Sequence, residues 1–213
     1  MRPESFFQRA SAPPAVMGLP GGPGDWCRRI CNSVLGLVAA LLLVGPLGVS
    51  AMDVDELVEA LGLEPHVEGG YFRRTFQADH RERIATTSGD RYTMTSIYYL
   101  LTGTSRVGHW HLNRSDILHF YHLGAPITYY LIHPDGRLET VVMGPDPTQG
   151  HKLQFAVKGG TWKASHLETG DYGLISEAVS PGFEYADMTL GRREDMQLQF
   201  PQHAELIERF SKP

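Results

Sequence analysis

Short runs of β-forming residues, each bounded by turn residues, follow one another along most of the chain after Pro65. The runs are rich in Val, Ile, Tyr and Phe, and turn signals such as SGD, TGTS, HPDG and SPG separate them. Many short strands at this spacing predict an antiparallel sandwich or barrel, so we expect an all-β fold. The eight runs are residues 71–78, 93–101, 117–123, 127–133, 139–143, 152–157, 172–179 and 183–190.

Helical patterns occur only at the two ends of this β-rich region. Apolar residues recur at helical spacing from Val54 to Leu61, with Asp53 placed to cap the helix and Gly62 to end it. The segment AELIERF, residues 204–210, is the second helical pattern. Since no tandem repeat or internal linker interrupts residues 52–213, we predict that they form one domain with a short helix at each end.

Residues 1–51 have a different pattern and are predicted to be a leader. They begin with a stretch rich in Pro, Gly and Ser, and no residue from Asn32 to Met52 is charged. Within this gap lies the apolar run 34–44, and Val49 and Ala51 occupy the small-residue positions of a signal-peptidase site. This arrangement predicts a cleaved signal peptide, and hence a protein that is secreted or in the secretory pathway.

Other interpretations of the leader stay open. An uncleaved anchor would place residues 34–49 in a membrane, but the apolar run is short for the 17–25 residues or so that spanning needs. The segment could also be an organelle-targeting leader. If translation starts at Met52, the protein is cytoplasmic.

Charge and cysteine content narrow the possible functions. The chain carries 24 Asp and Glu against 19 Lys and Arg, and residues 52–213 alone hold 22 against 15. Nucleic-acid binders usually have a basic surplus, so that class is excluded. Both cysteines precede residue 52 and all ten histidines follow it, so a metal site in the body must use His and carboxylate ligands.

The segment GTSRVGHWHLNRSDILHFYHLG, residues 103–124, carries the clearest candidate chemistry. His109 and His111 are two residues apart, so on a strand both point to the same face. With Asp116 nearby, they form a set that suits a divalent metal. The same set suits acid–base catalysis, because an imidazole oriented by a carboxylate accepts a proton near neutral pH.

The spacing of this segment resembles the first cupin motif, in which Gly is followed after five residues by His-x-His and then by Glu and Gly. Here Gly103 precedes the His pair and Asp116 stands in the Glu position. The stretch KGGTWK, residues 158–163, resembles the second cupin motif, with Lys163 in place of its final His.

The resemblance extends over nearly all of residues 52–213. EGGYFRRTF, TSIYYLLTG, SDILHFYHLGAP, GGTWKA and SPGFEYADM resemble one uncharacterised cupin family, whose members are often labelled predicted sugar epimerases. It implies a double-stranded β-helix, the jelly roll of the dTDP-sugar-epimerase-like cupins, that commonly forms a homodimer.

We expect no metal cofactor, because an ammonium at position 163 would repel a divalent cation. The resemblance makes a metal-independent isomerase or epimerase of a small, carbohydrate-like substrate feasible. A His would remove a proton, Asp116 would orient that imidazole, a tyrosine would return the proton, and Lys163 or Arg73 would hold an anionic group. The predicted catalytic residues are His109, His111, Asp116 and Tyr71. The predicted ligand-binding residues are Glu68, Arg73, His119, Tyr121 and Lys163.

Two alternative functions remain at this point. The same site could bind a small sugar or anion without catalysis. It could also be a metal-dependent enzyme site that uses His109, His111 and Asp116 as ligands. In each case the expected partner is a small molecule.

Overall fold

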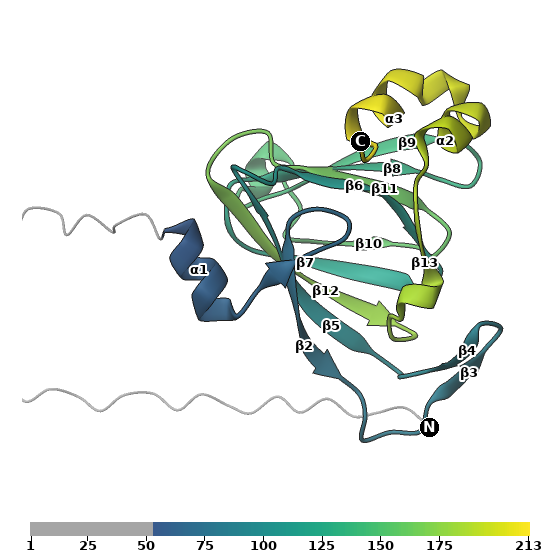
Figure 1. Ribbon diagram of the computed structural model, residues 1–213. Helices are drawn as coiled ribbons and strands as arrows, with labels where there is room; N and C mark the ends of the chain where they lie inside the picture. The colour runs from purple at the N-terminus through teal and green to yellow at the C-terminus, as the bar shows by residue number, and fades with distance from the viewer. Residues whose placement is uncertain (1–52) are drawn as a thin grey trace, which may run out of the picture. The chain divides into compact units, whose positions relative to one another are not determined.

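Two antiparallel β-sheets face each other in the computed structural model, which describes residues 53–213 (Figure 1). The six-stranded sheet has the order β1 (Glu64–Pro65), β2 (Tyr71–Gln77), β5 (Thr95–Thr102), β12 (Tyr172–Ser180), β7 (Asp116–Gly124) and β10 (Gln154–Val157). The five-stranded sheet has the order β13 (Met188–Leu190), β6 (Val107–Asn113), β11 (Trp162–His166), β8 (Ile127–Ile132) and β9 (Leu138–Met143). From β5 to β8 the chain crosses between the sheets at every connection, which is the jelly-roll topology that we predicted.

Inward-facing side chains of both sheets form the central hydrophobic core. Tyr99 and Leu101 of β5 and Ile175 of β12 contribute from one sheet, and Tyr129 and Leu131 of β8 contribute from the other. Alternation along each strand places these residues on one face, because successive side chains point to opposite sides. Phe72 of β2 and Ile97 of β5 pack against this core and also line the cavity that adjoins it.

Helix α1 (Val54–Leu61) is the helix that the cap and apolar stripe predicted, and it lies on the outer face of the six-stranded sheet. The side chain of Asp53 accepts a hydrogen bond from the Asp55 backbone N–H, and Gly62 ends the helix with φ 58°. Leu57 packs there with Leu100 and Leu174.

Two C-terminal helices cover the outer face of the five-stranded sheet (Figure 1). Helix α3 (Ala204–Phe210) is the predicted one, whereas α2 (Arg193–Gln199) was not expected, because only Met196 of its seven residues is buried. Trp110 of β6 points outward into this layer and is completely buried. The 3-10 helices η1 (Pro147–Gln149) and η3 (Pro201–His203) complete the connections.

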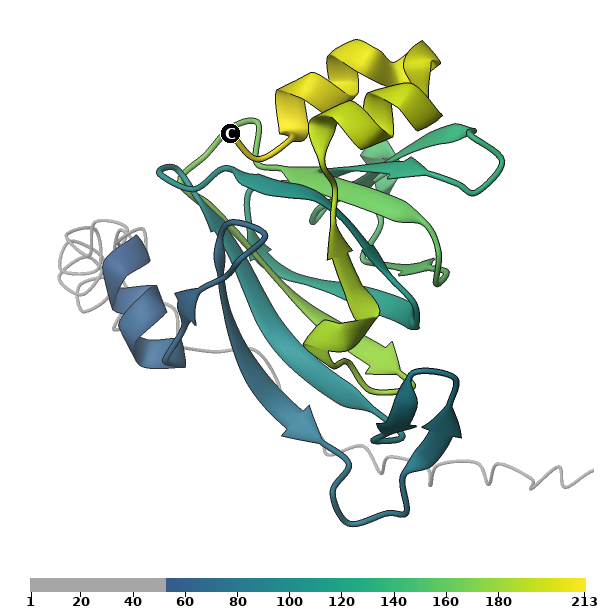
Figure 2. The same ribbon diagram turned by 45° about the vertical axis from the view of Figure 1, so that its right-hand side comes forward.

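The prediction of a strand at 183–190 is wrong for residues 183–187. Only β13 is a strand, and Tyr185–Asp187 form the 3-10 helix η2. The guanidinium of Arg91, in the hairpin of β3 (Ile84–Thr86) and β4 (Gly89–Arg91), forms a buried ion pair with Asp187. Figure 2 shows this hairpin beside the segment that leads from β12 to β13. Residues 181–187, which we call the mouth segment, thus cross between the sheets.

The predictions about a signal peptide, anchor or organelle leader concern residues 1–51 and lie outside the described residues. Within residues 53–213, no helix is both long enough and apolar enough to cross a membrane.

Candidate functional site

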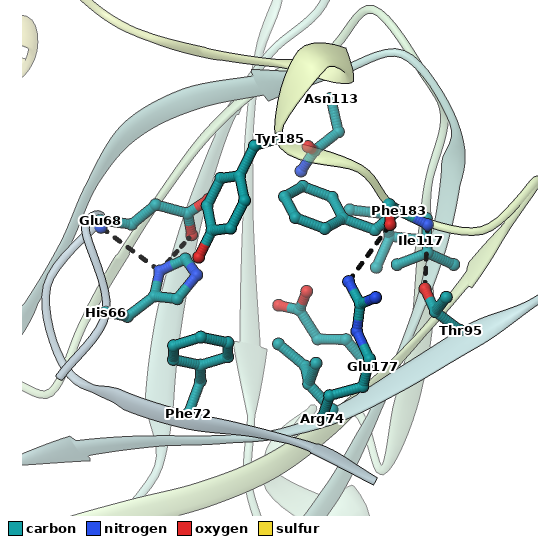
Figure 3. Close-up of a pocket in the computed structure, with 12 residues that line it drawn as sticks. His66, Glu68, Phe72, Arg74, Thr95, Asn113, Ile117, Glu177, Phe183 and Tyr185 are labelled. Carbon is teal, nitrogen blue, oxygen red and sulfur yellow. Dashed lines mark hydrogen bonds and ion pairs between the residues drawn. The ribbon is translucent and has the colours of Figure 1, made fainter. Parts of the chain in front are cut away.

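A cavity of about 40 Å³, which we call the cup, lies between the two sheets beneath the mouth segment (Figure 3). This volume is room for about three water molecules. Its wall is mixed: the apolar side chains of Phe72, Ile97, Ile117 and Val179 alternate with polar groups. The polar lining residues are His66, Glu68, Arg74, Thr95, Asn113, Glu177 and Tyr185.

A tight turn before β2 brings Glu68 into the cup. Gly69 and Gly70 have φ angles of 96° and 70°, which side-chain-bearing residues rarely adopt. A Cβ on Gly69 would also collide with the backbone carbonyl of Val107. The His109 N–H donates to the Glu68 carbonyl at 2.6 Å, which holds the turn against β6. The turn geometry therefore requires the glycine pair after Glu68.

Glu68 lies between two histidines. Its Oε2 is 3.2 Å from Nε2 of His111 and 3.5 Å from Nδ1 of His66. Nδ1 of His111 lies 2.8 Å from the carbonyl oxygen of His109. Because a carbonyl only accepts, this Nδ1 carries the hydrogen and the lone pair of Nε2 lies on the side of Glu68. Nε2 has no partner in hydrogen-bonding geometry among the described residues.

Burial sets the protonation states of Glu68, His66 and His111. It raises the pKa of Glu68 from its ordinary 4.5 to about 8, so the carboxyl holds its proton at neutral pH. Burial lowers the pKa of His66 to about 4. Burial, with the nearby Lys163, also holds the pKa of His111 well below its ordinary value. The group thus combines a neutral acid with neutral imidazoles.

A second buried group lies deeper, around Lys163 of β11. Its Nζ is 3.0 Å from Nε2 of His119 and 3.1 Å from Oε1 of Glu177. All three residues are buried, and His119 stacks on Phe155. Although burial acts to raise the pKa of Glu177, the charge of Lys163 holds it well below its ordinary value. Glu177 is therefore an ionised carboxylate in an ion pair.

The donor set does not fit the divalent metal that cupin motifs often hold. Lys163 pairs with His111 across β11 and β6, where a ligand imidazole would be needed. Its ammonium lies within hydrogen-bond distance of His119 and Glu177, the side chains that would otherwise be free to ligate. In residues 53–213 no group of three or more His, Cys, Asp or Glu side chains is arranged to hold a metal ion.

Of the predicted site residues, Glu68 lines the cup, and three others contact its lining carboxyl groups: His111 lies beside Glu68, and His119 and Lys163 lie beside Glu177. His109 does not join them, because its Nδ1 lies 3.2 Å from the Phe210 carbonyl at the end of α3. Asp116 is exposed, and its carboxylate accepts a hydrogen bond from the Gly159 N–H at 2.8 Å. The expected pairing of Asp116 with the histidines is not found.

The other three predicted residues lie elsewhere. Tyr71 packs in the outer cluster around α1, and the guanidinium of Arg73 lies over the ring of Tyr98. Alternation along β2 explains this, because it turns their neighbours Phe72 and Arg74 toward the cup instead. The Tyr121 hydroxyl donates to the Gly124 carbonyl.

Sequence reasoning missed His66, Arg74, Asn113, Glu177 and Tyr185. Glu177 had a signal, since it is the one charged residue within the apolar run YGLISEAV. Asn113 and Arg74 follow from strand parity once His111 and Phe72 are known to face inward. Tyr185 had none, because its run was interpreted as a strand.

Comparisons with known proteins agree with the fold. A family model described as Cupin superfamily (DUF985) matches residues 55–191. The chain is 36% identical over 155 residues to the uncharacterized protein YML079W of Saccharomyces cerevisiae, covering 67% of this chain and 77% of that one.

Two solved structures are also similar. The protein SO0799 from Shewanella oneidensis is 32% identical, with a TM-score of 0.69 and coverage of 76% of this chain and 98% of that chain. A hypothetical protein from Leishmania major is 28% identical, with a TM-score of 0.70 and coverage of 75% and 99%.

Proposed function

Because the chain belongs to the family described as Cupin superfamily (DUF985), whose relatives named above carry no stated activity, we propose a function from the chemistry of the cup. The proposal is a metal-independent isomerase or epimerase of a small, polar, carbohydrate-like substrate. One observation carries it: Glu68 and Glu177 both line the cup, but Glu68 is protonated and Glu177 is ionised. The neutral imidazole of His111 lies beside Glu68. Two carboxyl groups whose pKa values are shifted in opposite directions suit acid–base chemistry.

Each polar group then has a role in moving a proton next to a carbonyl. Nε2 of His111 takes the proton from carbon, and the electron pair moves to form an enol. The carboxyl of Glu68 donates its proton to the carbonyl oxygen as that oxygen gains charge. Lys163 pairs with Glu177 and so holds that lining carboxylate in its ionised form.

Tyr185 replaces Tyr71 as the candidate for returning a proton. Figure 3 shows its side chain crossing the mouth with the hydroxyl directed toward His66 and Glu68. A proton delivered from there to the carbon inverts its configuration, whereas a proton delivered to the neighbouring carbon moves the carbonyl. As the carbonyl re-forms, the enol O–H returns a proton to the Glu68 carboxylate, and the proton left on His111 passes through solvent to the ionised Tyr185, so that all three groups are restored.

The test is incorporation of solvent deuterium at carbon. The protein is incubated in D₂O with aldoses, ketoses and their acid derivatives, and the products are analysed by mass spectrometry and NMR. For a substrate that exchanges, we expect His111→Gln to slow exchange by about 10²–10⁴-fold. His109→Gln is the matched control and should retain the rate, because that imidazole contacts Phe210 outside the cup. Equal losses in both variants would refute the role of His111.

A ligand-binding role without chemistry is the second candidate, favoured by the small volume of the cup, about 40 Å³. A sugar does not fit until the mouth segment moves, so the described conformation suits retention of a ligand as well as catalysis. Saturable binding of a sugar in the cup, with no deuterium incorporated into any compound that binds, would support this candidate over the isomerase.

A further inference from the structure

Arg74 lies at the mouth of the cup. The bulge of β2 between Arg74 and Phe76 follows it, and its side chain lines the cavity with Phe183 and Tyr185 (Figure 3). Its guanidinium donates to Oε1 of Gln77 at 3.0 Å and to the carbonyl of Phe183 at 3.2 Å. A guanidinium has five N–H donors, so these two neutral acceptors leave donors for a ligand.

The charge of Arg74 is not balanced inside the protein. No carboxylate of residues 53–213 forms an ion pair with it. The other charges of the cup cancel, because Lys163 pairs with Glu177 while Glu68 and His66 are neutral at pH 7. The cup therefore has a net positive charge, located at its mouth.

A buried amide supplies a second recognition group. The side chain of Asn113 is 8% exposed and lines the cavity, and its oxygen has no hydrogen-bond partner among the described residues. A buried polar atom without a partner is costly unless a ligand or water satisfies it. A hydroxyl group satisfies an amide oxygen by donating to it.

From this geometry we infer that the substrate of the proposed reaction carries an oxyanionic group, a carboxylate or a phosphate, which Arg74 binds at the mouth while Asn113 binds a hydroxyl deeper in the cup. This inference rests on the proposed function and specifies its substrate class as hydroxylated acids or their phosphate counterparts. Guanidinium is suited to both anions, because its planar donors match two of their oxygens.

The experiment compares binding of D-glucuronate, D-glucose 6-phosphate and neutral D-glucose by calorimetry at low salt. We expect one of the two anions to bind at least about tenfold more tightly than glucose, the factor typical of one charge-assisted hydrogen bond. The tighter of the two identifies the anion as carboxylate or phosphate. Arg74→Gln should abolish this preference, and Asn113→Leu should weaken all three sugars.

Arg73→Gln is the matched control for charge. It removes the same charge from the adjacent residue, whose guanidinium lies over Tyr98 on the outer face. The preference should survive in this variant. Any of three results would overturn the inference. The unmodified protein could bind anionic and neutral sugars equally well, or bind neither anion. The two arginine variants could also lose affinity equally.

Failure of the inference is distinguishable from failure of the proposed function. If the protein prefers anionic sugars through Arg74 but incorporates no deuterium into any sugar that it binds, the binding site is supported and the isomerase is refuted. Deuterium incorporation into neutral sugars that Arg74→Gln leaves unchanged supports the isomerase and refutes the role of Arg74.

Discussion

Lys163 is the residue whose ammonium opposes a divalent cation in the deeper buried group. Its ammonium lies within hydrogen-bond distance of His119 and Glu177, so removing it takes the counter-charge away from the ionised Glu177. We expect Lys163→His to bind Mn²⁺ or Zn²⁺ at least about tenfold more tightly than the unmodified protein. The new imidazole adds a ligand and removes the repulsive charge. Calorimetric titration measures the difference.

Lys163→Met is the control for this prediction, because it removes the charge without adding a ligand. It should fall short of the histidine variant in metal affinity. Stoichiometric, tight metal binding by the unmodified protein, with no gain in Lys163→His, would show that our assignment of a metal-free cup is wrong.

Glu68 should make stability decrease as pH rises. Its pKa is about 8 in the folded protein and ordinarily 4.5, so between these values the folded state holds a proton that the unfolded state has lost. Stability therefore falls with increasing pH across that window, by about 1 kcal/mol per pH unit from this residue. His66 acts oppositely between pH 4 and 6.5, because its folded pKa is lowered.

The comparison that isolates this effect is the unmodified protein against Glu68→Gln. Chemical denaturation is measured from pH 5 to 8.5, and the difference in unfolding free energy should move steadily against the unmodified protein up to about pH 8. A difference that is flat from about pH 7.5 to 8, where His66 is largely neutral in both states, would contradict the raised pKa.

Residue spacing predicted part of the site. His111, Lys163, Glu68 and His119 were found from motif offsets and strand alternation. Asp116 was misassigned because an offset along the chain does not reveal that its strand begins at an exposed turn beside Gly159. His66 approaches Glu68 only through the positive φ angles of the turn after it, which spacing alone does not encode.

A few buried side chains account for most of what the C-terminal helices contribute to stability. Phe210 of α3 is fully buried in the cluster around Trp110, whereas Leu198 of α2 is 86% exposed. We expect Phe210→Ala to lower the free energy of unfolding by about 3–5 kcal/mol, and Leu198→Ala to change it by less than about 0.5 kcal/mol. Urea denaturation of both variants tests this, and similar values would mean that the helices are not packed as described.

The elements themselves were predictable where local signals were complete. Helix α1 has an N-cap, an apolar stripe and a terminating glycine, and it was predicted with these bounds. Helix α2 lacks a side-chain cap and buries one residue, so no pattern identified it. The sequence of the mouth segment is typical of a strand, but Tyr185–Asp187 form a 3-10 helix, and Asp187 is held by its ion pair with Arg91.

For the whole molecule, the core clusters lie in residues 57–210, and the family match spans 55–191. We therefore expect deletion of residues 1–51 to leave the melting temperature unchanged, because the remaining chain is long enough to bury its own core. Differential scanning calorimetry of the two proteins measures this. A large decrease in the shortened protein would show that the apolar run 34–44 packs into the domain.

The small size of the cup has a kinetic consequence. Since about 40 Å³ admits only a few water molecules, a sugar has to wait until Phe183 and Tyr185 move aside. The observed association rate should then rise with sugar concentration only at first and level off at the opening rate of the mouth. Stopped-flow fluorescence would reveal this plateau, and Tyr185→Ala should raise it. A strictly linear dependence in both proteins would mean that entry requires no opening step.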